Sequence, residues 1–309
     1  MTQQTDTTTL AHDRRRDFAW IIVAYTVALV AAWATVVVGQ SYTNDALYGP
    51  LYLGAAADLS ATLVIFGFSR WFGNSSFYDA YWSVIPPVLL AYWFWAYGVL
   101  DFRLVLVWLL VTAWAVRLTH NWARGWQGLT HVDWRYVDLQ QSTGKAYPLV
   151  DLLGIQLLPT VLVFAGCVPV WIAITVTAAG QTTSIGLLDL LWILVGTAAV
   201  YLEFRADNVL RRFRLNPQNR GQVLRHDVWA WCRHPNYLGE IGFWLSLALA
   251  GFAVSDSAWV WLGFVLMVIL FVGITIPMID KRQLANKPDY ATYREEVFSL
   301  IPKPPRTST

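Results

Sequence analysis

The residues with the clearest chemical potential lie between 205 and 240, where a basic segment precedes an apolar run. Six arginines concentrate positive charge there: Arg205, Arg211, Arg212, Arg214, Arg220 and Arg225. Pro235 fits the first turn of a helix, because the N–H that proline lacks is not needed there. A helix that begins at Pro235 directs free N–H groups and the positive end of its dipole toward the basic segment. The pattern indicates either a phosphate-binding site at a membrane surface or an ordinary helix start beside charges that set membrane orientation.

Charged residues at helical spacing surround this segment. Four of them are spaced four, four and three residues apart: Glu203, Asp207, Arg211 and Arg214. They share one face if the preceding apolar helix continues, and form either ion pairs on a solvated helix or the lining of a nucleotide pocket. After Pro235, Glu240 lies one turn beyond Asn236. Its carboxylate either stabilises the helix N-terminus or accepts hydrogen bonds from a ligand.

A second group of polar residues lies in the N-terminal half. Asp58 is in the middle of an apolar run, where a carboxylate is costly and usually faces a cavity or a partner. Asp79 precedes the next run and is expected at the membrane interface. Arg117 and Asn121 share a helical face, and charges alternate with aromatic residues around Arg135. This region is either an interfacial anchor or the second half of a polar site.

The elements that must position these residues are membrane-spanning helices. The chain has 309 residues, of which 56% are hydrophobic and 14% charged, whereas soluble domains carry about 25% charged residues. Membrane enzymes, transporters and receptors are the remaining classes. Eight apolar runs are about long enough to span a bilayer as helices: 18–38, 51–72, 80–100, 104–119, 149–177, 185–204, 237–254 and 257–279. We expect an all-α polytopic membrane protein.

The distribution of basic residues predicts the orientation of these helices. With the N-terminal arginines in the cytoplasm, four loops fall outside: 39–50, 101–103, 178–184 and 255–256. Of the 22 lysines and arginines, only Arg103 then lies outside, in agreement with the positive-inside rule. Both termini are expected in the cytoplasm. We predict a disordered tail over 1–17, a single transmembrane domain over 18–279 and a cytoplasmic segment over 280–309, which lies on the membrane or folds back over the basic segment.

Other chemistries find no support in the sequence. The five histidines are scattered and the two cysteines, Cys167 and Cys232, lie far apart, so we expect neither a metal site nor a disulfide framework. A glycine-rich dinucleotide fingerprint and a serine nucleophile elbow do not occur. No internal repeat supports an inverted-repeat transporter. We expect no nucleic-acid partner, and the oligomeric state stays open.

Two longer motifs resemble a known family. Asp207-Asn-Val-Leu-Arg211-Arg-Phe-Arg214 and Arg233-His-Pro-Asn236-Tyr237-Leu-Gly239-Glu240 resemble the C-terminal domain of the steroid 5-alpha-reductase superfamily, in particular its bacterial branch of uncharacterised membrane proteins. Shorter motifs extend the resemblance to about residues 79–302: Asp79-Ala-Tyr-Trp82, Trp114-Ala-Val-Arg117-Leu118 and Asp133-Trp-Arg135-Tyr136. The resemblance implies an enzyme of the bacterial inner membrane that binds NADPH from the cytoplasm, and the many arginines suit a 2′-phosphate.

The resemblance also implies roles for individual residues. The cofactor residues are expected to be Asp207, Arg211, Arg214, Arg233, His234, Asn236, Tyr237, Glu240 and Tyr290. The expected reaction is reduction of a lipophilic alkene conjugated to a carbonyl, in a sterol, polyprenoid or unsaturated lipid that enters from the bilayer. Tyr136 is the expected proton donor, and Asp79 the accompanying acid. Independently of the resemblance, the polar residues that we expect on the substrate side are Asp58, Arg117, Asn121 and Arg135.

Two other functions remain open. Related membrane methyltransferases share the Arg-His-Pro-X-Tyr signature and bind S-adenosylmethionine, but they carry adjacent glutamates where this chain has Ile279-Asp280-Lys281. The missing glutamate pair counts against methyl transfer. Steroid reductases use a tyrosine and a glutamate to polarise the substrate carbonyl, and here Trp114 stands where that tyrosine is expected, which puts a steroid substrate in doubt. A lipid-binding or transport protein that uses Asp58 is the non-enzymatic alternative.

Overall fold

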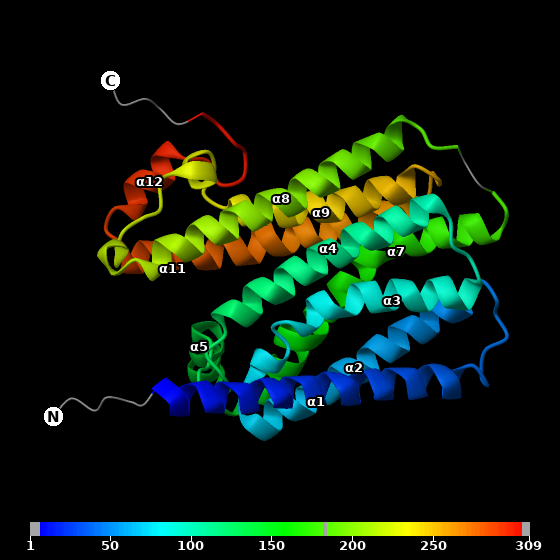
Figure 1. The fold of residues 1–309 in the computed structure, drawn as a ribbon, viewed down its shortest axis with the longest axis horizontal. Coiled ribbons are helices and arrows are strands. Elements are labelled where there is room, and N and C mark those ends of the chain that lie inside the picture. The colour runs from blue at the N-terminus through cyan, green and yellow to red at the C-terminus, as the bar shows by residue number, and fades with distance from the viewer. Residues whose placement is uncertain (1–6, 182–183, 305–309) are drawn as a thin grey trace. The chain divides into compact units, whose positions relative to one another are not determined.

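The protein is described by a computed structural model that covers residues 7–181 and 184–304. These residues form helices joined by turns and loops, and no β-strand occurs among them (Figure 1). The prediction of an all-helical protein is confirmed.

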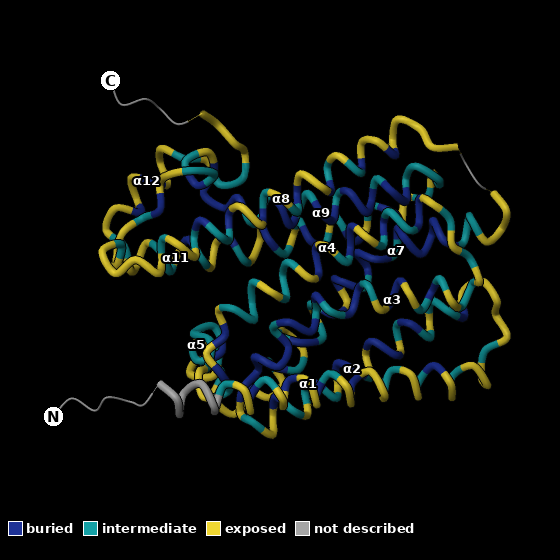
Figure 2. Tube along the Cα trace, in the orientation of Figure 1, coloured by how far each residue is buried: buried dark blue, intermediate teal, exposed yellow. Residues whose placement is uncertain are grey.

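Six helical stretches of the described chain are long and apolar enough to cross a membrane. They are Arg14–Gly39, Gly49–Phe72, Phe102–Gly125, Trp134–Ala178, Leu187–Leu215 and Ala258–Asn286. Large apolar side chains on them are exposed, among them Ile22 at 64%, Val30 at 63% and Leu194 at 67% (Figure 2). Extended exposed apolar surface of this kind is suited to lipid rather than water. The helices support an integral membrane protein.

Each of the eight predicted runs falls on a helical stretch, but two of these helices are not among the six. The helix α3 (Tyr81–Tyr97) has 17 residues, which is short for a span of about 20. The helix α9 (Pro235–Phe252) has polar residues in its first two turns, including Asn236 and Glu240. The count of eight spans and the cytoplasmic position of both termini therefore stay predictions.

The first helix extends further toward the N-terminus than the predicted tail allows. The helix α1 (Thr7–Gly39) includes residues 7–17, and residues 1–6 lie outside the described part of the chain. Two side chains anchor its start. Asp17 accepts a hydrogen bond of 2.8 Å from the Leu129 backbone N–H, and Arg14 donates to the Ala123 carbonyl at 2.8 Å. These contacts explain why the helix persists through a charged segment.

The chain divides into two compact units, which are described separately. Unit 1 extends to Leu100 and resumes from Trp114 to Phe164, and unit 2 consists of Asp101–Ala113 and the chain from Ala165. The helices α4 (Phe102–Gly125) and α7 (Leu158–Ala178) contribute to both units. The remaining elements of unit 1 are α1, α2 (Gly49–Phe72), a 3-10 turn at Ser75–Phe77, α3, α5 (Trp134–Thr143), a second 3-10 turn at Gly144–Ala146, α6 (Tyr147–Val150) and a π-helical segment at Asp151–Leu157.

Unit 1 is built on the antiparallel packing of α1 with α2, beside α3. A hydrogen bond of 3.0 Å between Thr35 and Ser60 joins α1 to α2. Trp93 of α3 is fully buried and donates to the Pro50 carbonyl at the start of α2 at 3.2 Å. In this way α2 and α3 are held at a fixed register, which positions the acidic residues at Asp58 and Asp79.

Unit 2 is built around two closely packed helices, α8 (Leu187–Leu215) and α9. A Cβ atom on Gly239 would lie 2.4 Å from the Glu203 Cγ and 2.8 Å from the Ala199 carbonyl oxygen. Such small residues allow helix backbones to approach closely. The other elements of unit 2 are 3-10 turns at Pro217–Asn219, Asp227–Ala230 and Ala258–Trp261, α10 (Leu262–Val268), a π-helical segment at Ile269–Thr275, α11 (Ile276–Asn286) and α12 (Tyr290–Glu296).

Candidate functional site

A buried network in unit 2 is centred on Asp280 of α11. The Arg233 Nη2 donates to Asp280 Oδ2 at 3.1 Å, and the His234 Nε2 lies 2.9 Å from Asp280 Oδ1. The Tyr290 hydroxyl donates to the same Oδ1. All four residues are buried. The structure thus brings together three of the residues that were predicted to bind the cofactor. Their common partner is the carboxylate of Asp280, and their hydrogen bonds join α11, α12 and the loop before α9.

The same loop holds the chain from 289 to 303, which we call the α12 segment. Arg233 donates through Nη1 to the carbonyls of Arg294 at 2.9 Å and Val297 at 2.6 Å. The backbone N–H groups of Arg233 and His234 donate to the carbonyls of residues 298 and 299, at 2.9 and 3.1 Å. Tyr293 donates to the Trp229 carbonyl at 2.5 Å. The α12 segment therefore folds back over the loop, which was one of the two predicted arrangements.

The arginines of the basic segment fall into two groups. Arg205 makes two hydrogen bonds to Asp227, and Arg225 donates to Glu296 at 2.6 Å and to the Asp289 carbonyl at 2.9 Å. No side-chain hydrogen bond or salt bridge to a described residue involves any of the other four, which are all exposed: Arg211, Arg212, Arg214 and Arg220. The first group thus joins separate parts of the fold through charged hydrogen bonds.

Arg214 lies in a cluster of charged and polar residues from three helices. It interacts electrostatically with Tyr237 at the start of α9 and with Asp207 one to two turns before it on α8. Burial, together with the charge of Arg214, lowers the pKa of Lys287 at the end of α11. Arg214 and Lys287 repel each other, and an anion bound between them would stabilise the charged form of both.

The predicted helix start at Pro235 is confirmed, because α9 begins at that residue. The Asn236 Oδ1 is buried and has no hydrogen-bond partner among the described residues. The ring of Tyr237 stacks on that of His234, with centroids 5.5 Å apart. Glu240 is buried and accepts a hydrogen bond of 3.0 Å from Trp244. Asn236 and Glu240 lie one turn apart on α9, so both can face a ligand at the helix start.

In unit 1, the two predicted catalytic residues are in contact. The Tyr136 hydroxyl, from α5, donates a hydrogen bond to Asp79 Oδ1 at the start of α3. The Arg135 guanidinium lies 3.9 Å from the same oxygen and is held by Asp133 through a 2.8 Å contact. Burial raises the pKa of Asp79 to about 6, although Arg135 and Tyr136 act in the opposite direction. The arrangement is an acid–tyrosine pair with a neighbouring cation.

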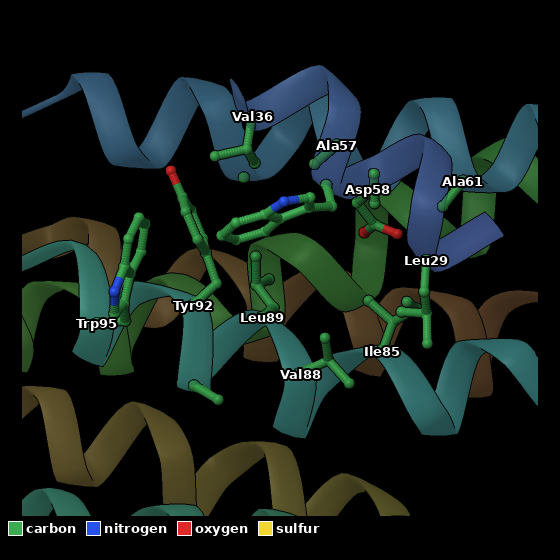
Figure 3. Close-up of a pocket in the computed structure, with 14 residues that line it drawn as sticks. Leu29, Val36, Ala57, Asp58, Ala61, Ile85, Val88, Leu89, Tyr92 and Trp95 are labelled. Carbon is green, nitrogen blue, oxygen red and sulfur yellow. The ribbon is translucent and has the colours of Figure 1, made fainter. Parts of the chain in front are cut away.

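Asp58 forms a second acid–tyrosine pair in unit 1. The Tyr81 hydroxyl donates to Asp58 Oδ1 at 3.0 Å, whereas Asp58 Oδ2 is buried without a partner among the described residues. Asp58 lines an apolar cavity of about 410 Å³ between α1, α2 and α3 (Figure 3). On α4, the Asn121 Oδ1 accepts hydrogen bonds from Arg124 at 2.8 and 3.2 Å, and the partly exposed Arg117 lies one turn before it.

Sequence reasoning did not single out Tyr81 or Lys287. Tyr81 is 23 residues from Asp58, and only the packing of α2 against α3 brings the two together. Lys287 follows α11, and the charge of Arg214 on α8 acts on it although 73 residues of chain separate the two. No local spacing signals either contact. The sequence shows Asp280 as a single acid after the last apolar run, and it does not predict the hydrogen bonds of Asp280 to its three partners.

Comparisons with known proteins place the chain in a family. The family model for DUF1295, described as a protein of unknown function, matches residues 65–297. The match includes Asp79, Tyr136 and the residues of the unit 2 site, and begins after Asp58. An uncharacterised protein of Schizosaccharomyces pombe, C594.04c, is 26% identical over 282 residues, with 82% of this chain and 80% of the relative covered. No solved structure matches. The chain belongs to the DUF1295 family of proteins of unknown function.

Proposed function

We propose that this protein is a membrane-embedded, NADPH-dependent reductase of a lipophilic substrate in which an alkene is conjugated to a carbonyl. One observation carries the proposal. Arg205 and Arg225 make charged hydrogen bonds to acids of the fold, whereas the side chains of Arg211 and Arg214 make no hydrogen bond or salt bridge with a described residue. Guanidinium groups bind phosphate bidentately. The resemblance of the surrounding motifs to the steroid 5-alpha-reductase superfamily supports the reductase class.

The residues present in unit 2 fit NADPH. Arg211 and Arg214, with Lys287 beside Arg214, suit the negative charge of the 2′-phosphate and the diphosphate. The Asn236 Oδ1 is buried without a described partner, and it suits the amide N–H of the nicotinamide. Glu240 suits a ribose hydroxyl. When bound, NADPH supplies the hydride that reduces the β-carbon of the alkene.

The acid–tyrosine pair of unit 1 suits the proton-transfer half of the reaction. As hydride reaches the β-carbon, negative charge develops on the carbonyl oxygen of the substrate. Tyr136 would donate its proton to that oxygen, and the resulting enol would become the ketone when its α-carbon takes up a proton from water and its oxygen returns a proton to Tyr136. The Arg135 guanidinium, 5.5 Å from the centre of the Tyr136 ring, would stabilise the tyrosinate between these two proton transfers.

Binding measurements on the full-length protein in detergent test the cofactor. NADPH should bind more tightly than NADH or S-adenosylmethionine. Arg211→Ala and Arg214→Ala should each weaken NADPH binding by about 1.5–3 kcal/mol, because each removes a charged hydrogen bond. Arg212→Ala is the matched control, since Arg212 is an exposed arginine on another face of α8. Equal affinity for NADPH and NADH, unchanged in both variants, would show that these arginines serve only membrane orientation.

Turnover separates the reductase from the alternatives. Purified protein with membrane lipid extract should oxidise NADPH and yield a lipid that is heavier by two hydrogens. Methylated lipid from S-adenosylmethionine without NADPH consumption would instead assign a methyltransferase. Lipid binding without either reaction would assign a lipid-binding or transport protein.

We further propose eight spans, with both termini in the cytoplasm, in the bacterial inner membrane. In this topology, all residues that we expect to bind the cofactor lie on the cytoplasmic side, where NADPH is present. Reporter fusions after residues 45, 180 and 309 should read outside, outside and inside. An outside C-terminus would remove the cytoplasmic cofactor site.

A further inference from the structure

The apolar cavity of unit 1 is built to hold a ligand with a polar end. Its volume of about 410 Å³ lies within the roughly 300–1,000 Å³ that is usual for small-molecule sites. Its lining is almost entirely aliphatic and aromatic side chains of α1, α2 and α3, and the one ionisable acid in it is Asp58. Figure 3 shows Asp58 near one end of the lining, with Tyr92 and Trp95 toward the other. An apolar body with one polar end therefore fits the cavity.

The two oxygens of Asp58 differ in their surroundings. The Tyr81 hydroxyl donates a hydrogen bond of 3.0 Å to Oδ1, which fixes the orientation of the carboxyl group. Oδ2 is buried without a partner among the described residues, and Asp58 as a whole is only 5% exposed. A buried polar atom without a hydrogen bond destabilises the folded state. A ligand group that pairs with Oδ2 recovers this free energy.

The chemistry of the carboxyl group selects the polar end of the ligand. If Asp58 is ionised, Oδ2 only accepts hydrogen bonds, and a ketone or aldehyde cannot pair with it. If Asp58 is protonated on Oδ2, this oxygen donates, and an ammonium group cannot pair with it. A hydroxyl group both donates and accepts, so it pairs with Oδ2 in either state.

The rim of the cavity is open on the side where lipid is expected. Trp33 and Trp95 both line the cavity and are 55% and 59% exposed, with ring centroids 5.7 Å apart. They come from α1 and α3, whose exposed apolar faces are suited to the bilayer. A ligand can therefore reach the cavity from the membrane.

We propose that the unit 1 cavity binds a lipid alcohol, with its hydroxyl group on Asp58 Oδ2 and its apolar body between α1, α2 and α3. The inference goes beyond the proposed reductase, since it concerns what this cavity binds and is measured without NADPH. A carbonyl lipid that bound better would instead place the reducible end of a substrate at Asp58.

A pair of ligands with one carbon skeleton tests the proposal. Radiolabelled farnesol, an alcohol, and farnesal, the corresponding aldehyde, are bound to the full-length protein in one detergent. At about pH 9, where the carboxyl group of Asp58 is ionised and only accepts hydrogen bonds, wild-type protein should bind farnesol at least tenfold more tightly. Asp58→Asn keeps an acceptor for Tyr81 but turns an N–H donor toward the ligand, so the preference should fall to about threefold or less. Asp45→Asn, an exposed acid of the same unit, is the control and should keep the wild-type preference.

A second variant tests the cavity itself and does not depend on Asp58. Ala57→Leu places three additional carbons in the cavity lining and should weaken both ligands at least tenfold. Ala34→Leu, at an exposed position of α1 outside the lining, should leave both affinities unchanged. Equal or tighter binding of farnesal to wild-type protein, binding of neither ligand, or affinities that Ala57→Leu does not change would each overturn the proposal. Loss of NADPH binding alone would leave it intact and refute only the reductase.

Discussion

Replacing Asp280 by asparagine tests whether the buried network of unit 2 holds the α12 segment in place. Asp280 accepts from Arg233 at 3.1 Å, lies 2.9 Å from His234 Nε2 and accepts from Tyr290. The asparagine amide removes the negative charge and presents N–H donors to partners that are themselves donors. Arg233 is only 8% exposed, so its charge would remain buried without a carboxylate. Breaking such a buried pair is destabilising by about 3–5 kcal/mol.

The assay is thermal unfolding of full-length protein in detergent, followed by tryptophan fluorescence, with limited proteolysis of the α12 segment beside it. Asp280→Asn should unfold at a clearly lower temperature and be cleaved faster after residue 286. Asp256→Asn changes an exposed acid of the same unit and should behave as wild type. The reasoning fails if Asp280→Asn has wild-type stability and loses NADPH affinity, because Asp280 and its partners would then serve the cofactor rather than the fold.

Two further predictions concern stability in each unit. Burial raises the pKa of Asp79 from an ordinary value of 3.8 to about 6, so the folded state keeps its proton between these values while the unfolded state loses it. The free energy of unfolding should therefore fall as pH rises from about 4 to 6, and more steeply in wild-type protein than in Asp79→Asn, as pH-dependent thermal unfolding can measure. Equal slopes would mean that Asp79 ionises normally. Gly239→Ala should destabilise the α8–α9 contact by about 1–3 kcal/mol, because the new Cβ would lie 2.4 Å from the Glu203 Cγ. Gly67→Ala, where nothing lies within 4 Å, should unfold no more easily than wild type, and equal loss in both alanine variants would contradict close packing at Gly239.

The sequence by itself determined the helical and membrane character of the protein. Runs of apolar residues that are long enough to cross a bilayer must satisfy their backbone hydrogen bonds internally, so they form helices whatever their neighbours are. The start of α9 at Pro235 was equally local, since it follows from the backbone chemistry of one residue. Asp79 and Tyr136 were each expected as catalytic residues but not as partners, and the structure shows a hydrogen bond between them.

The tertiary structure alone decided which charged and polar side chains are hydrogen-bonded to another part of the protein. Asp280 meets Arg233 and His234 across 47 and 46 residues of chain, and Asp58 meets Tyr81 across 23. Helical periodicity specifies neighbours three and four residues apart, so it carries no information about partners at such separations. The basic segment shows this most clearly. All four residues are arginines, but among Arg205, Arg211, Arg214 and Arg225 only Arg205 and Arg225 make hydrogen bonds to acids of the described chain.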